Sequence, residues 1–193
     1  MPRALDLLLA ALLLALGAPV LAAAAIAIRL ESRGPVLYRQ RRIGRDGRPF
    51  ELWKLRTMVS GAESMGAGVY VLEGDPRITR VGRLLRRFSL DELPNLINVL
   101  RGEMAIVGPR PTVREQVDRY TERQHRRLEV KPGITGWAQV NGRTSLPWPE
   151  RIELDVWYVE HRSPRLDLRI LTRTARMLAT GHGLYSEELK QGW

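Results

Sequence analysis

Hydrophobic positions divide the chain into one long uncharged stretch near the N-terminus and a basic remainder with shorter amphipathic patterns. Between Leu7 and Ile28, 22 consecutive residues carry no charge, and most of them are Leu or Ala. A helix of that length rises about 1.5 Å per residue and is just long enough for a bilayer core of roughly 30 Å. The pattern therefore predicts an N-terminal helix that enters a membrane.

Three topologies are open for this helix. A cleaved signal peptide would suit the small residues 22–24, but the apolar run exceeds the usual core of about 7–15 residues, and Asp6 interrupts a positive leader. A straight span would place basic flanks, Arg3 and Arg29, on opposite sides, although both favour the cytoplasm. Pro19 removes a helical hydrogen bond and favours a kink. We therefore favour a bent, re-entrant helix and keep the straight span as an alternative.

Two stretches with strand character follow the apolar helix. Residues Val36–Arg42 and Phe50–Arg56 flank the sequence Gly44-Arg45-Asp46-Gly47. An Asp-Gly step between two such stretches is a signal for a tight hairpin turn. We therefore expect a small β-hairpin here.

Helical periodicity begins between Ile78 and Phe88, where three arginines share one face: Arg83, Arg86 and Arg87. Such a cluster is usually a solvated helix face. The next segment has an apolar stripe at helical spacing, formed by Leu93, Leu96, Ile97 and Leu100. Ser89 and Glu92 match a capping box. Because Pro94 lies too deep for an undisturbed first turn, we expect the helix to bend or restart there.

The adjacent acids Asp91 and Glu92 allow two interpretations. Acidic residues in a first helical turn stabilise the helix dipole and are common for that reason alone. Alternatively, the pair is catalytic. Consecutive residues on a helix point about 100° apart, so divided roles would then be expected, with one acid attacking or binding metal and the other orienting or anchoring.

Composition limits the classes of function. The formal net charge is +10, cysteine is absent and there are three histidines. The positive charge favours lipid headgroups, nucleotides or nucleic acid as partners. Thiolate metal sites are excluded, histidine-centred catalysis is disfavoured, and Walker A, GxGxxG, HExxH and GxSxG motifs do not occur. Aromatic residues are not interleaved with the arginines as in single-strand binders, which argues against nucleic acid.

Two rigid turns carry basic residues. Within residues 102–111, a short apolar strand leads into Pro109-Arg110-Pro111, where two prolines restrict the backbone around one guanidinium. Residues 131–143 form another turn, strand and turn that ends at Arg143. These features favour a phosphorylated substrate at a membrane surface.

Near the C-terminus, Leu168, Leu171, Ala175 and Leu178 form an apolar helix face beside a basic stripe, which suits either a membrane surface or the protein's own core.

The longer motifs resemble those of the monotopic phosphoglycosyl transferases, also called the bacterial sugar transferase family. The resemblance runs through nearly the whole chain and rests on QRRIGRDGRPF (40–50), KLRTM (54–58), DPRITRVGRLLRRFSLDELPNLINVLRGEMAIVGPRP (75–111), KPGITGWAQVNGR (131–143) and LDVWYV (154–159).

This resemblance implies the chemistry. Asp91 is expected to attack the sugar-bearing phosphorus of a UDP-sugar and release UMP, and the phosphosugar would then pass to polyprenyl phosphate. Mg²⁺ is the implied cofactor, with Asp91 and Glu92 as the acids closest to it. The other positions that the resemblance places near the substrates are Lys54, Arg86, Arg110, Arg143 and Asp155.

The resemblance also implies an α+β, mostly helical fold with a re-entrant membrane helix over residues 1–30 and a catalytic domain over residues 31–193. That domain would face the cytoplasm at the bacterial inner membrane, with a small hairpin and amphipathic helices at the lipid surface. The expected partners are UDP-sugar, polyprenyl phosphate, membrane lipid and a second copy of the chain, with no nucleic acid. One departure concerns the helix bend, where the family often has Ser-Pro and this chain has Ala18-Pro19, so a hydroxyl partner for a freed carbonyl is lost.

Two other functions remain as alternatives. A membrane-anchored basic protein without enzymatic activity would account for the charge and the apolar helix. An enzyme that transfers the sugar phosphate directly to the lipid, without a covalent intermediate, would account for the same motifs.

Overall fold

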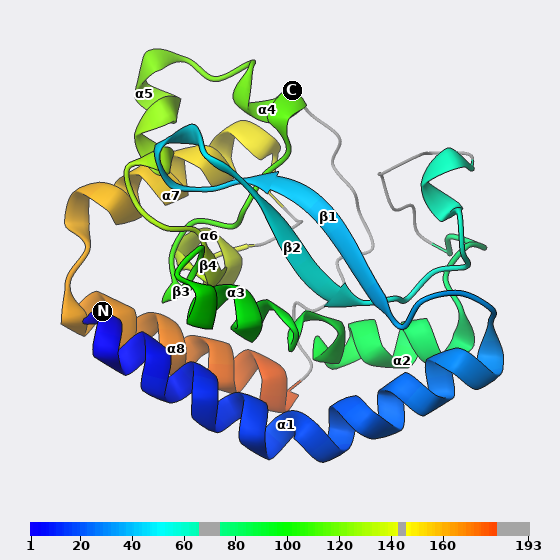
Figure 1. Cartoon of the computed structure of the whole chain (residues 1–193). Helices are drawn as coiled ribbons and strands as arrows, with labels where there is room; N and C mark the ends of the chain where they lie inside the picture. The colour runs from blue at the N-terminus through cyan, green and yellow to red at the C-terminus, as the bar shows by residue number, and fades with distance from the viewer. Residues whose placement is uncertain (66–73, 143–145, 181–193) are drawn as a thin grey trace.

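The computed structural model describes residues 1–65, 74–142 and 146–180, and the fold is a mostly helical α+β arrangement (Figure 1). The elements in chain order are α1 (Arg3–Glu31), β1 (Leu37–Ile43), η1 (Arg45–Gly47), β2 (Pro49–Leu55), η2 (Ala62–Ser64), α2 (Arg80–Arg87), η3 (Leu90–Glu92), α3 (Asn95–Arg101), β3 (Ala105–Val107), α4 (Arg114–Val117), α5 (Glu122–His125), η4 (Arg126–Leu128), β4 (Gly133–Thr135), α6 (Trp137–Val140), α7 (Trp148–His161) and α8 (Pro164–Thr180).

Helix α1 is long and apolar enough to cross a membrane, and only 11% of its most apolar window is buried. Figure 1 shows it bent near its middle, and Pro19 lies inside the helix. Leu8 and Leu16 are 65% and 69% exposed. Because a core helix of a soluble protein would bury such residues, the exposed leucines favour a lipid environment for this helix.

A narrow face of α1 nevertheless packs against the rest of the protein in two places. Ala10, in the N-terminal half, is fully buried in a core with residues of α3, β3 and α8. Ala24 and Ile28, in the C-terminal half, are buried against Leu55 of β2 and Leu85 of α2. Both halves of the helix are therefore in contact with the same folded unit.

Polar side chains fasten each end of α1 as well. At the start, Arg3 donates to the backbone carbonyls of Val99 and Leu100 at the end of α3. The buried Asp6 accepts from the Ile106 amide of β3 at 3.0 Å. At the other end, the Glu31 carboxylate accepts from the amides of Arg80 and Val81 at 2.6 and 2.9 Å. These amides are otherwise unpaired donors of the first turn of α2, so Glu31 caps that helix from outside.

The predicted hairpin is confirmed, with each strand shifted by one residue from its expected limits. Strands β1 and β2 pair antiparallel from Leu37 opposite Leu55 to Ile43 opposite Pro49. Asp46 and Gly47 in the turn have φ angles of 56° and 72°, as the Asp-Gly signal requires. Side chains alternate between the two faces of the hairpin, so one face carries Tyr38, Gln40, Arg42, Leu52 and Lys54.

The fold has a second sheet, whose two strands were each predicted from local signals but whose pairing was not. Strands β3 and β4 pair in parallel, Ala105 with Gly133 and Val107 with Thr135. A Cβ on Gly133 would lie 2.1 Å from the backbone nitrogen of Gly108, so the close approach requires glycine. The pairing brings the turn after β3, with Arg110, next to the turn before β4.

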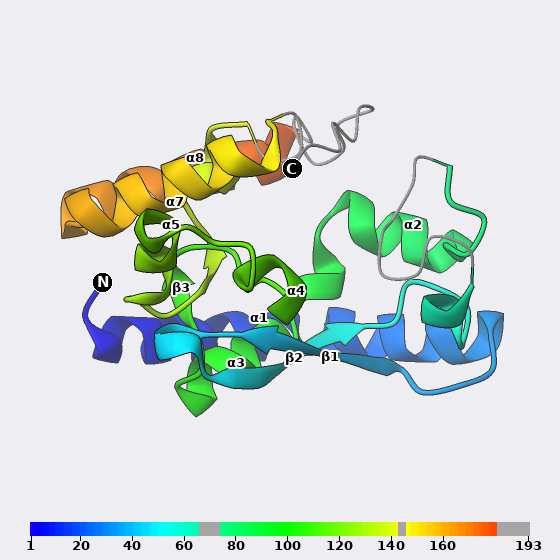
Figure 2. The ribbon, with the colours of Figure 1, turned by 90° about the horizontal axis from the view of Figure 1, so that it is seen from above.

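Helices α7 and α8 complete the fold beside these strands, as Figure 2 shows from above. The predicted C-terminal helix is confirmed, but its core-facing residues include Leu166 and Ile170. On the apolar face expected from the sequence, Leu168 and Leu178 are 63% and 45% exposed. Leu171 of the same face packs against the core, so this face is divided between core contact and exposure.

Candidate active site

The acidic pair lies in a short 3-10 turn between two helices. The turn η3 holds Asp91 and Glu92, and α3 begins after Pro94, so the predicted restart of the helix is confirmed. The predicted capping box is wrong, because the Ser89 side chain makes no cap hydrogen bond and Glu92 binds elsewhere. Ser89 instead adopts a left-handed conformation with φ of 53°, which is uncommon outside glycine and turns the chain sharply into the acidic pair.

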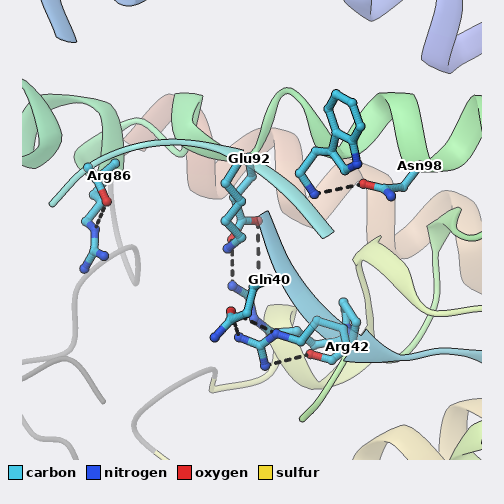
Figure 3. A network of polar contacts seen from close by, with 10 residues as sticks. Gln40, Arg42, Arg86, Glu92 and Asn98 are labelled. Carbon is cyan, nitrogen blue, oxygen red and sulfur yellow. Dashed lines mark hydrogen bonds and ion pairs between the residues drawn. The ribbon is translucent and has the colours of Figure 1, made fainter. Parts of the chain in front are cut away.

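Glu92 is held by two cations from different parts of the fold (Figure 3). Lys54 of β2 donates to its Oε1 at 2.8 Å, and Arg110 donates to the same oxygen at 2.6 Å and to Oε2 at 3.4 Å. Burial by itself raises the pKa of Glu92, but Arg110 and Lys54 lower it well below the usual value. Glu92 is therefore an ionised anchor that fixes two basic side chains beside Asp91.

Asp91 has a different environment from its neighbour. It is only 9% exposed, yet no side chain or amide in the described ranges donates a hydrogen bond to its carboxylate. Burial and the charge of Glu92 raise the pKa of Asp91, while Lys54, Arg86 and Arg110 act in the opposite direction. The contacts of the two acids therefore differ, as divided roles would require. Glu92 is paired with Lys54 and Arg110, whereas the Asp91 carboxylate accepts no hydrogen bond from the described residues.

Arg86 contributes a cation from the opposite side. It lies near the end of α2, and its Nε donates to the Thr57 hydroxyl at 2.9 Å. Figure 3 shows it separated from Glu92 and well away from Gln40 and Arg42. Because its positive charge acts on Asp91, Arg86 belongs to the surroundings of the acidic pair, as expected.

Asp155 is placed behind the site and contacts it through another arginine. Its Oδ2 accepts from Nη2 of Arg127 at 2.5 Å, and the same nitrogen donates to the carbonyl of Arg110 at 2.8 Å. Arg127 also donates to the hydroxyl of Tyr120. Asp155 is thus brought near Arg110, and its contacts are those of a residue that positions the Pro109-Pro111 turn. The expected site residue Arg143 lies outside the described residues.

Two residues of this site were not singled out from the sequence. Arg42 and Gln40 share the hairpin face of Lys54, and Arg42 lines the same cavity as Lys54, Glu92 and Arg110. The two-residue alternation along β1 and β2 was an available signal for this grouping. Asn98 joins α3 to β2, because its side chain accepts from the Trp53 amide and donates to the Glu51 carbonyl.

The acidic pair can be tested against the implied Mg²⁺. Within the described residues, no group of three or more His, Cys, Asp or Glu side chains is placed to hold a metal. Mg²⁺ is commonly held by one or two carboxylates together with substrate phosphates, so a large acidic cage is not needed. The open carboxylate of Asp91 fits that arrangement, whereas the Glu92 oxygens are already occupied by Lys54 and Arg110.

Comparison with known proteins gives one family. Residues 1–181 match the family described as bacterial sugar transferase. An uncharacterized sugar transferase of Bacillus subtilis is 45% identical over 182 residues, which cover 94% of this chain and 89% of that protein. A UDP-glucose:undecaprenyl-phosphate glucose-1-phosphate transferase of Caulobacter vibrioides is 46% identical, with 95% of this chain and 71% of that protein covered. The Escherichia coli enzyme of the same name is also 46% identical, but the match covers 89% of this chain and only 39% of that enzyme. The chain therefore belongs to the bacterial sugar transferase family.

Proposed function

We propose that this protein transfers a sugar 1-phosphate from a UDP-sugar to undecaprenyl phosphate and releases UMP, with Asp91 as the nucleophile. The observation that carries the proposal is the contrast within the acidic pair. Glu92 holds Lys54 and Arg110 in place, while the buried Asp91 beside it has no hydrogen-bond donor among the described residues. The names of the Caulobacter vibrioides and Escherichia coli relatives support the same reaction type.

In the first step, a carboxylate oxygen of Asp91 attacks the sugar-bearing phosphorus, and the bond from that phosphorus to the oxygen of UMP breaks. The attacking and attacked groups are both anionic. Lys54, Arg86 and Arg110 reduce that repulsion and stabilise charge in the transition state. When bound at the open Asp91 carboxylate, Mg²⁺ would neutralise further phosphate charge.

In the second step, a phosphate oxygen of undecaprenyl phosphate attacks the phosphorus of the covalent intermediate. The Asp91 carboxylate leaves, and a diphosphate-linked sugar lipid remains in the membrane. Glu92 keeps the two cations in position through both steps, because its charge remains paired with them.

We further propose that α1 is re-entrant and that the folded unit lies on the cytoplasmic side; the geometry of α1 supports the re-entrant attachment. Arg3 and Asp6 bind one end of α1 to the folded unit, and Glu31 binds the other end. A straight span would have to release one of these sets, since its ends lie on opposite sides of the bilayer.

Topology can be tested with single cysteines, because the natural chain has none. Cysteine at the exposed positions Pro2 or Arg33 should react with a membrane-impermeant reagent only after the cytoplasmic face is opened, like a reference cysteine at Asp118. Labelling of positions 2 and 33 from opposite sides would show a straight span.

The nucleophile is tested with Asp91→Asn, which keeps the size of the side chain but removes its charge. We expect UMP release to fall by at least about 10⁴-fold, as is typical when an essential nucleophile is lost. The matched control Asp118→Asn changes an exposed acid and should keep near-normal turnover.

The covalent step has its own readout. After exposure to UDP-sugar alone, the intact wild-type protein should gain the mass of one phosphosugar, and Asp91→Asn should not. Rapid quench without this adduct, combined with normal turnover, would favour direct transfer to the lipid.

A further inference from the structure

Arg42 is a partly buried cation whose hydrogen-bond partners are all uncharged. On β1 it faces the cavity, and Gln40 Oε1 accepts from its Nε and Nη2 at 3.1 and 2.5 Å. Nη1 makes a long contact of 3.5 Å with the carbonyl of Pro111. An arginine has more N–H donors than these contacts use, so donors remain for a ligand.

The charges around Arg42 are not balanced. Arg42, Lys54 and Arg110 line one small cavity, and Glu92 is the carboxylate that lines it with them. Within the described part of the chain, Arg42 forms no ion pair of its own. Burial lowers its pKa to about 10, and the charge of Arg110 acts in the same direction. Because like charges that line one cavity repel each other, this cavity is suited to an anion with more than one negative charge.

The position of Arg42 separates it from the apolar helix. Figure 1 shows β1 rising away from α1, and Arg42 lies near the far end of that strand. Arg86 lies on α2, whose Leu85 packs against Ala24 and Ile28 of α1. In Figure 3 the two arginines lie on opposite sides of Glu92. A phosphate attached to a lipid must stay close to the membrane, whereas a soluble nucleotide can reach the distal side.

We propose that Arg42, oriented by Gln40, binds the phosphates of the nucleotide donor together with Lys54 and Arg110. This inference rests on the proposed function and adds a residue to it. Arg42 holds the uridylate end of the diphosphate, so it stabilises the UMP that leaves when Asp91 attacks. Arg86 and Thr57 are left for the phosphate of the lipid acceptor on the side of α1.

The test compares Arg42→Gln with Arg41→Gln in the purified full chain. Arg41 is the next residue of β1 and is exposed on the other face of the hairpin, so it is a matched control. For Arg42→Gln we expect the dissociation constant of UDP, measured by isothermal titration, to rise about 10- to 100-fold, as for a lost charge-assisted hydrogen bond. Uridine, which has no phosphate, should bind both variants equally.

Kinetics separate the two substrates. Arg42→Gln should raise the KM for the UDP-sugar by a similar factor and leave the half-saturating concentration of undecaprenyl phosphate unchanged. Unchanged UDP binding and KM would overturn the proposal, and so would an effect confined to undecaprenyl phosphate. If wild type binds UDP through Arg42 but releases no UMP from any UDP-sugar, the nucleotide subsite stands and the proposed reaction fails.

Two further variants cover the case in which Arg42→Gln does not fold. Arg42→Lys keeps the charge but cannot be held at two nitrogens by Gln40, and it should weaken UDP binding less than Arg42→Gln. Gln40→Leu removes the holder and leaves Arg42 in place, with a loss of a few-fold. Wild-type UDP affinity in both variants would contradict the proposal.

Discussion

Arg110 lies between two networks of the same chemical kind that have very different surroundings. The front network consists of Glu92, Lys54 and the Arg110 side chain, and it lines a cavity. The rear network consists of Arg127, Asp155 and Tyr120, and it holds the Arg110 carbonyl. One network therefore contacts the side chain of the turn, and the other contacts its backbone.

Exposure and charge balance distinguish the two networks. The side chains of Arg127 and Asp155 are 2% and 3% exposed, and each charge has an opposite partner. In the front network Arg110 is 44% exposed, and Arg42 adds a further cation. A closed, balanced pair fixes the backbone, whereas an open, unbalanced cluster is suited to bind a ligand. The following variants test whether this division of roles is correct.

The largest effect on stability is expected at the rear network. Arg127→Met leaves the Asp155 carboxylate buried without its cation, and we expect a loss of about 3–5 kcal/mol in the free energy of unfolding. Chemical denaturation in detergent would measure it. The double variant Arg127→Met with Asp155→Leu should recover most of the stability, because no uncompensated charge is then buried. If the single variant is as stable as wild type, the rear network has no structural role.

At the front network the effect should fall on turnover. Glu92→Gln keeps the shape of the side chain but releases the charge that holds Lys54 and Arg110. We expect kcat/KM to fall about 100-fold, roughly 2.7 kcal/mol in the transition state, with a smaller change in unfolding temperature than for Arg127→Met. Glu115→Gln, an exposed acid, is the control. If Glu92→Gln destabilises the protein but the folded fraction keeps normal kcat/KM, the front network has a structural role and the proposed division between the two networks is wrong.

Local patterns predicted the elements well and the tertiary contacts poorly. The hairpin, the restart at Pro94 and the C-terminal helix each depend on residues close together in sequence, and all three are confirmed. The capping box failed because Lys54 and Arg110 attract Glu92 from distant parts of the chain. The parallel pairing of β3 with β4 joins two short strands separated by several helices, and no local pattern contains that information.

The candidate site shows the same limit. The resemblance placed Asp91, Glu92, Lys54, Arg86 and Arg110 near one another, and the structure brings them together. The resemblance does not say which of its residues reach the cavity. Asp155, which it places near the substrates, contacts the Arg110 carbonyl through Arg127. Arg42 was missed because four polar residues, 39–42, stand together, and only the strand pairing decides which of them face Lys54.

A smaller effect of pH is expected from the rear network. Burial raises the pKa of Asp155 to about 6, although Arg127 acts in the opposite direction. The folded protein therefore holds this proton more tightly than the unfolded chain, and ionisation reduces stability as pH rises toward and through 6. A shift of about two pKa units corresponds to about 2.5 kcal/mol. We therefore expect the unfolding temperature of wild type, relative to Asp155→Asn, to fall by roughly 5–10 °C between pH 4 and 7. A difference that stays constant over this range would show that Asp155 is ionised throughout.

The smallest effect is expected at a third group of charges, on the surface. Arg123 binds Glu153 at 3.0 Å and Glu160 at 3.3 Å, so it forms close ion pairs as Arg127 does. Its side chain is 54% exposed, and water screens exposed pairs and solvates each partner after the other is removed. Arg123→Gln should therefore leave both turnover and unfolding temperature unchanged within error. A loss as large as that of Arg127→Met would mean that ion-pair geometry, and not burial, decides which arginines stabilise this fold.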